Sequence, residues 1–160
     1  MNIDIGTPVP EDAYKSDLAL LDRYQNYSSE LIRLSLLGIG ALAFFLGQVS
    51  ARASYPSLKD GISALALGSA AVLFTLATAC ALSHRYHSSD GFASHIKAIR
   101  LSTIDPEAAQ REAKLRNRTY KKSGRWLGAA VVLFGAGGFL FSFVIARQVY
   151  LWVTSAALTC

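Results

Sequence analysis

Three stretches of the chain are apolar and free of charged residues, at 34–51, 61–83 and 126–146. A helix rises about 1.5 Å per residue, so about 20 residues cross the roughly 30 Å hydrocarbon core of a bilayer. A spanning segment must satisfy its own backbone hydrogen bonds, and in so short a chain only a helix does so. None of the stretches has the polar stripe that core helices of a soluble bundle retain. The pattern therefore predicts an all-α integral membrane protein with three transmembrane helices.

These stretches divide the chain into seven segments. Three crossings place the first and fifth segments on one side of the membrane and the third and seventh on the other. We expect a cytoplasmic N-terminal amphipathic helix at 1–33, a first span at 34–51, a short outer loop at 52–60, a second span at 61–83, a cytoplasmic basic helical hairpin at 84–125, a third span at 126–146 and an outer apolar tail at 147–160.

The cytoplasmic segments are themselves predicted to be helical. In 11–33, apolar residues recur at intervals of three and four, which forms one apolar helix face: Tyr14, Leu18, Leu21 and then Tyr24 or Gln25. In the hairpin, Asp105 is expected to be an N-cap and Pro106 the first residue of a helix that runs without interruption into the third span. Together these helices predict a small cytoplasmic helical bundle.

The C-terminal tail leaves two alternatives open. Residues 149–160 are apolar but too few to cross the membrane again. Either the third helix extends outward past Arg147, or the tail lies along the outer surface.

The distribution of basic residues predicts the orientation. Thirteen of the sixteen Lys and Arg residues fall in the first and fifth segments, and three fall in the third and seventh. By the positive-inside rule, the N-terminus is cytoplasmic and the C-terminus outside, as in a multi-pass protein of the cell (inner) membrane. The first 33 residues lack the basic start and adjoining apolar region of a secretory signal, so we expect an uncleaved first span. The composition, 52% apolar and 17% charged with mean hydropathy +0.30, fits the membrane prediction.

A dense run of basic residues precedes the third span. We interpret it as a contact with anionic lipid head groups, worth about 1 kcal/mol per basic residue near the surface, although these charges would also set the topology by themselves. No fold for reading bases surrounds the run, so we expect no nucleic-acid partner. The residues are Arg111, Lys114, Arg116, Arg118, Lys121, Lys122 and Arg125.

Small residues recur at four-residue intervals in and beside the spans. Such spacing lets helix backbones approach closely, within one chain or between chains. Because three helices leave much of their surface uncovered, we expect a homo-oligomer in the lipid bilayer. The predicted helix-packing residues are Ala43, Gly47, Ala51, Ala64, Gly68, Gly124, Gly128, Gly138, Ser142 and Ala146.

The sequence gives little sign of catalysis, ion-coupled transport or metal binding. The three spans contain no Asp, Glu, His, Lys or Arg, so neither a catalytic group with its base nor an ion-coupled transport site is expected. A continuous helix would put His84, His87 and His95 on one face, but that spacing is wide for metal ligands, and ordinary interfacial histidines are favoured. We therefore expect no enzyme, metal site or cofactor.

Two functions from different classes fit this layout. The first is an oligomeric channel-like or membrane-perturbing effector controlled by its cytoplasmic helices. The second is a non-conducting anchor or subunit that recruits a cytoplasmic partner protein through residues 11–33 and 84–125.

Overall fold

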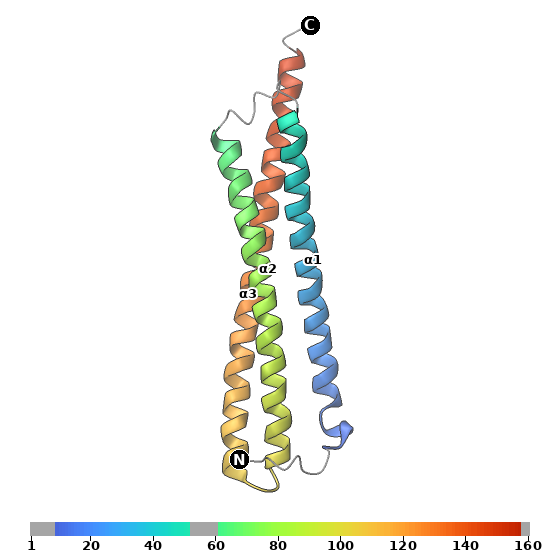
Figure 1. Ribbon diagram of the computed structural model, residues 1–160, viewed down its shortest axis with the longest axis vertical. Coiled ribbons are helices and arrows are strands. Elements are labelled where there is room, and N and C mark those ends of the chain that lie inside the picture. Colours follow the sequence, from blue (N-terminus) through green and yellow to red (C-terminus); the bar gives the residue numbers. More distant parts are fainter. Residues whose placement is uncertain (1–8, 52–60, 158–160) are drawn as a thin grey trace. The chain divides into compact units, whose positions relative to one another are not determined.

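The computed structural model describes residues 9–51 and 61–157, which form helices and no strand (Figure 1). A single 3-10 turn, η1 (Glu11–Ala13), precedes three long helices: α1 (Lys15–Ala51), α2 (Gly61–Leu101) and α3 (Pro106–Ala157). Each long helix is long and apolar enough to cross a membrane. The all-α prediction is confirmed for the described residues; the predicted outer loop at 52–60 lies outside them.

Local sequence explains where α3 begins. The Asp105 side chain accepts a hydrogen bond from the Ala108 backbone N–H at 2.9 Å, and Pro106 takes the first helical position. There the fixed φ of proline suits a helix and its missing N–H removes no bond. The predicted N-cap is thus confirmed. The helix then continues past Arg147 to Ala157, which is the first of the two alternatives for the tail; residues 158–160 lie outside the described part.

The chain separates into two compact units, and each of the three helices contributes to both. We call residues 9–30 and 80–128 the polar unit. The apolar unit consists of residues 31–51, 61–79 and 129–157. The borders between the units lie within four residues of the predicted ends of the spans.

The apolar unit has a core of large side chains centred on Phe74. This ring is 3% exposed and lies 5.7 Å, centroid to centroid, from the ring of Phe134. Two glycines give it room: a Cβ at Gly38 would lie 2.9 Å from the Phe74 ring, and one at Gly137 would lie 3.3 Å from it. Close approach of α1 and α3 to α2 therefore depends on glycines outside the predicted small-residue pattern. The remaining core residues are Leu42, Leu67, Ala70 and Val144.

The predicted helix-packing residues lie on the surface of the single chain. Gly138 is half-buried, and the others are exposed, apart from Ala51, whose side chain lies outside the described part. A Cβ at any of the five glycines, Gly47, Gly68, Gly124, Gly128 and Gly138, would meet nothing described within 4 Å. These faces do not join helices within one described chain, and packing between chains stays a prediction.

The polar unit has a different kind of core. Its buried apolar residues are small, namely Cys80, Ala81 and Ala98. No Leu, Ile, Val or Phe is buried among the described residues of this unit. Each fully buried large apolar side chain stabilises a fold by about 1.5–3 kcal/mol, so this unit, whose large apolar side chains are at most partly buried, gains less from apolar burial than most bundles. Its remaining buried side chains are those of Ser28, His84, Ser88, Ser94, His95, Thr119 and Ser123.

Candidate functional site

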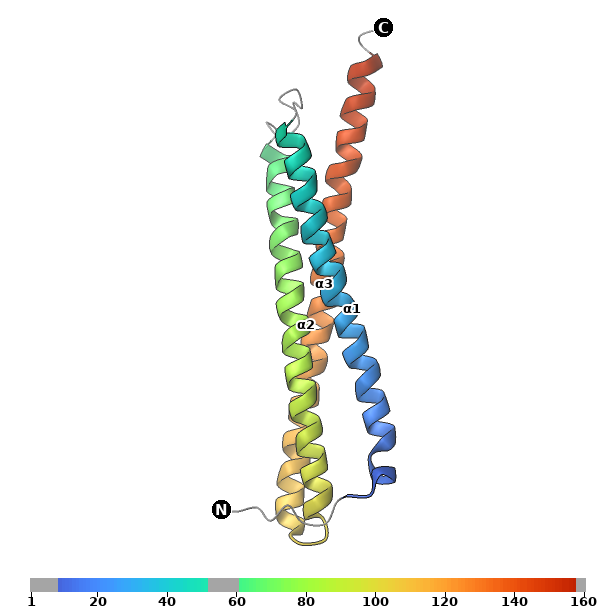
Figure 2. The same cartoon turned by 45° about the vertical axis from the view of Figure 1, so that its right-hand side comes forward.

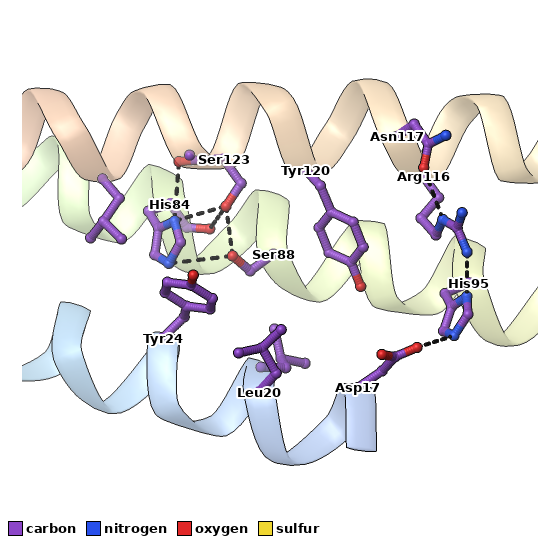
Figure 3. Close-up of a pocket in the computed structure, with 13 residues that line it drawn as sticks. Asp17, Leu20, Tyr24, His84, Ser88, His95, Arg116, Asn117, Tyr120 and Ser123 are labelled. Carbon is purple, nitrogen blue, oxygen red and sulfur yellow. Dashed lines mark hydrogen bonds and ion pairs between the residues drawn. The ribbon is translucent and has the colours of Figure 1, made fainter. Parts of the chain in front are cut away.

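A cleft of about 460 Å³ lies in the polar unit, within the size range of small-molecule pockets (Figure 3). Buried residues of α2 form its floor, with His84 3% and His95 9% exposed. Residues of α1 and α3 form its two sides, among them Tyr24 and Tyr120. All three helices therefore contribute to the cleft.

One group from each helix meets in the first polar layer of the cleft. The Arg116 guanidinium on α3 donates to His95 Nδ1 on α2 at 2.8 Å. On the other side of the ring, His95 Nε2 lies 2.8 Å from an Asp17 carboxylate oxygen on α1. That distance is within ion-pair range, but the Nε2–H is not aligned for a hydrogen bond. Because a guanidinium can only donate, Nδ1 is the acceptor and the ring proton is on Nε2, facing Asp17.

The second polar layer surrounds His84. Its Nδ1 lies 3.1 Å from the Ser123 carbonyl oxygen, which can only accept, so Nδ1 carries the proton. The Ser123 hydroxyl lies 2.7 Å from the same nitrogen and 2.6 Å from the Ser88 hydroxyl. Tyr24 of α1 packs edge-on against the imidazole, with centroids 6.4 Å apart. Here too all three helices contribute, but α1 supplies only a ring contact.

Tyr120 lies between the two layers. A Cβ at Gly91 would lie 2.8 Å from the Tyr120 ring, so this glycine lets the phenol pack against α2. Burial raises the pKa of the Tyr120 phenol, the charge of Asp17 raises it further, and Arg116 opposes both. The phenol therefore stays protonated at neutral pH and can donate a hydrogen bond into the cleft.

The layers repeat with a heptad period. Tyr24 follows Asp17 by seven positions on α1, and Ser123 follows Arg116 by seven positions on α3. His95 likewise follows Ser88 by seven positions on α2. Side chains seven apart share a helix face in a left-handed bundle, where polar groups in the seam can fix register. The polar unit is thus a three-helix seam built from polar groups.

Within this unit α1 is held less firmly than α2 and α3 are held to each other. Its further contacts with α2 include a hydrogen bond from Gln25 to Ser89 and one from Arg85 to Ser29, each 3.0 Å long, and the ring of Tyr14, just before α1, packs edge-on against Phe92. Exposed and partly buried polar contacts of this kind contribute about 1 kcal/mol each. Figure 2 shows α1 separating from α2 and α3 toward its N-terminal end.

Two links join α2 to α3. One is the buried serine–histidine cluster, and the other is an ion pair between Lys97 and Glu112. Because these groups hold α2 to α3, α1 is the element of the polar unit most easily displaced.

The structure divides the predicted basic run. Arg116 turns into the cleft, whereas the other six residues of the run are exposed. Of the three histidines, His84 and His95 share the cleft, and His87 lies outside it beside Tyr86. Within the described part of the chain, no group of three or more His, Cys, Asp or Glu side chains could hold a metal ion.

No family model, curated protein or solved structure matches this chain. The residues that assemble the cleft therefore come from the geometry alone. Sequence reasoning missed Asp17, Ser88 and Ser123. The signal that could have found them is the heptad repeat of polar residues on segments that also carry apolar faces.

Proposed function

We propose that this chain is an oligomeric, channel-like or membrane-perturbing effector of the cell membrane, controlled by its cytoplasmic polar unit. Three helices long and apolar enough to span a bilayer support the membrane assignment. The excess of basic residues in 1–33 and 84–125 supports a cytoplasmic N-terminus and polar unit and an outside C-terminus.

The observation that carries the proposal is the first polar layer, in which Asp17, His95 and Arg116 join all three helices. Each of these helices continues without a break into the apolar unit. We infer that a displacement of α1 at Asp17 also shifts its apolar part, because one helix connects the two, and helix shifts of this kind occur in switching proteins. Contacts in the polar unit thereby bias the arrangement of the predicted spans.

The energetic balance of the polar unit suits such control. Buried polar and charged groups exchange protein contacts for water contacts with a small net free energy, unlike a large apolar core. A shift of a few kcal/mol, within the reach of a bound partner or a change of charge, is enough to change the populations of two states. We infer that the docked position of α1 is the resting, closed state.

Dye release from vesicles containing the purified chain tests this function. Arg116→Gln removes a charge-assisted hydrogen bond, worth about 1.5–3 kcal/mol, and is expected to speed release about tenfold or more. Arg100→Gln, which removes an equal charge at an exposed position, is expected to leave the rate unchanged.

If neither the wild-type chain nor the Arg116→Gln variant releases dye, the effector proposal is wrong. The non-conducting anchor would then be the better account. The six exposed basic residues on α3 favour that second function, since they offer a surface to a cytoplasmic protein.

A further inference from the structure

The six exposed basic residues of α3 form one straight stripe. At about 100° per residue, they fall within an arc of about 100°, whereas Arg116 lies about 170° from the middle of that arc. We call them the basic stripe: Arg111, Lys114, Arg118, Lys121, Lys122 and Arg125.

No ion pair seen in the described chain involves the basic stripe, and the acidic residue on its face, Glu107, lies at its far end, one turn before its first residue. The ion pair of Lys97 with Glu112 and the contact of Asp17 with His95 involve other residues. Like charges three or four residues apart destabilise a helix by about 0.2–0.5 kcal/mol per pair. The stripe therefore lowers the stability of α3 until something anionic binds along it.

A bilayer surface reaches only one end of the basic stripe. From Arg111 to Arg125 the helix rises about 21 Å, whereas electrostatic attraction is screened over about 8 Å at physiological salt. Arg111 stands 15 residues before the predicted start of the third span at 126, about 22 Å along α3. Lipid head groups then lie near Lys121, Lys122 and Arg125 but leave the first half of the stripe uncovered.

The cleft opens beside the basic stripe. On α3, Asn117 and Gly124 line the cleft and lie within about 60° of the edge of the stripe formed by Lys114 and Lys121. On the opposite wall, Leu20 is 52% exposed and Tyr24 is 48% exposed. A rod placed along this opening would meet apolar side chains of α1 on one side and lysines of α3 on the other.

We propose that this groove and stripe bind an acidic amphipathic helix of a partner protein, which becomes the fourth helix of the polar unit. Its apolar edge lies on Leu20 and Tyr24, and its carboxylates pair with Lys114, Arg118 and Lys121. A partner helix matches the stripe because it has the same rise per residue as α3, so that its charged edge stays beside the charged edge of α3, as in coiled coils. This proposal deepens the proposed function and rests on it for its consequence, since a helix seated there contacts α1.

A nucleic acid would fit the charge but not the surroundings. Stacking of successive bases needs several open aromatic faces, whereas the groove offers one half-exposed tyrosine, Tyr24, since the Tyr120 ring is packed against Gly91. The groove instead offers Leu20 and Leu127, the kind of apolar surface onto which an amphipathic helix docks.

The test is fluorescence anisotropy with the full chain in nanodiscs of zwitterionic lipid. The probe is a labelled designed peptide of about 20 residues, with Leu along one helix face and Glu on the flanking positions. Lys114→Gln with Lys121→Gln is expected to weaken binding about tenfold or more. The matched pair Lys15→Gln with Arg100→Gln removes the same charge outside the stripe and should change binding less than twofold.

Gly124→Phe supplies an independent test of the groove. A Cβ at Gly124 meets nothing described within 4 Å, so the chain should still fold, while the ring blocks the groove wall and abolishes peptide binding. The proposal is overturned if a scrambled peptide of the same composition binds equally well. It is also overturned if duplex DNA displaces the peptide and binds more tightly, or if Gly124→Phe has no effect. Binding is measured without a permeability readout, so failure here is distinct from vesicles that never release dye.

Discussion

Replacing Gly38 with Leu is expected to lower the free energy of unfolding by about 1–3 kcal/mol, the usual cost of overpacking a tight helix contact. Even a Cβ at this position would lie 2.9 Å from the ring of Phe74, which is buried at the centre of the apolar core. The ring cannot move away without displacing Leu42 or Leu67 around it. Thermal unfolding in mild detergent, followed by circular dichroism, measures the loss.

Gly40→Leu is the matched control. It lies on the same helix, and a Cβ there would meet nothing described within 4 Å. Leu also favours a helix over Gly by up to about 1 kcal/mol, so the control should be neutral or slightly more stable. Equal destabilisation by the two substitutions would show that α1 does not pack on Phe74 as described.

Gly138→Leu is expected to break the proposed homo-oligomer while leaving each chain folded. Within one chain a Cβ at Gly138 meets nothing described within 4 Å, so Leu fits there without strain. If Gly138, Ser142 and Ala146 meet another chain, the added side chain costs about 1–3 kcal/mol at each contact. Light scattering of the detergent complex should then show a smaller assembly.

Ala136→Leu serves as the control, since it adds an apolar side chain at an exposed position of the same helix, about 160° around from Gly138. An unchanged assembly size for Gly138→Leu would mean that this face meets lipid, whose tails are as apolar as Leu. The channel-like form of the proposal would then lose its support from the exposed small residues.

Hydrophobic pattern was enough to predict the three helices, because absence of charge over about 20 residues is a strong and local signal. The start of α3 was equally local, since Asp105 and Pro106 act within one turn. The membrane borders, orientation and oligomer stay predictions, because they concern a bilayer and other chains. Local sequence was therefore enough to predict the helices, but it says little about what surrounds them.

The cleft was hidden for a physical reason. Serine is a residue type usually found at the surface, so the sequence does not mark Ser88 and Ser123 as buried. They are buried because α2 pairs with α3. Arg116 resembled its basic neighbours in a linear reading, although its helical angle sets it on the opposite face. Packing glycines were missed similarly, because the contact of Gly38 depends on a ring of α2.

Control of permeability by α1 in the polar unit can be tested by tethering this helix. Gln25→Cys with Ser89→Cys places one thiol on α1 and one on α2, where a hydrogen bond of 3.0 Å now joins the side chains. A short reducible crosslinker, applied to the Arg116→Gln variant with Cys80 and Cys160 replaced by Ser, would tether α1. The control pair, Lys97→Cys with Glu112→Cys, tethers α2 to α3 and leaves α1 free.

Dye release from vesicles is the measurement. Our account predicts that the α1–α2 crosslink stops release, that reduction of the crosslinker restores it, and that the α2–α3 crosslink leaves the rate unchanged. Release that continues at the same rate with α1 tethered would contradict control by this helix.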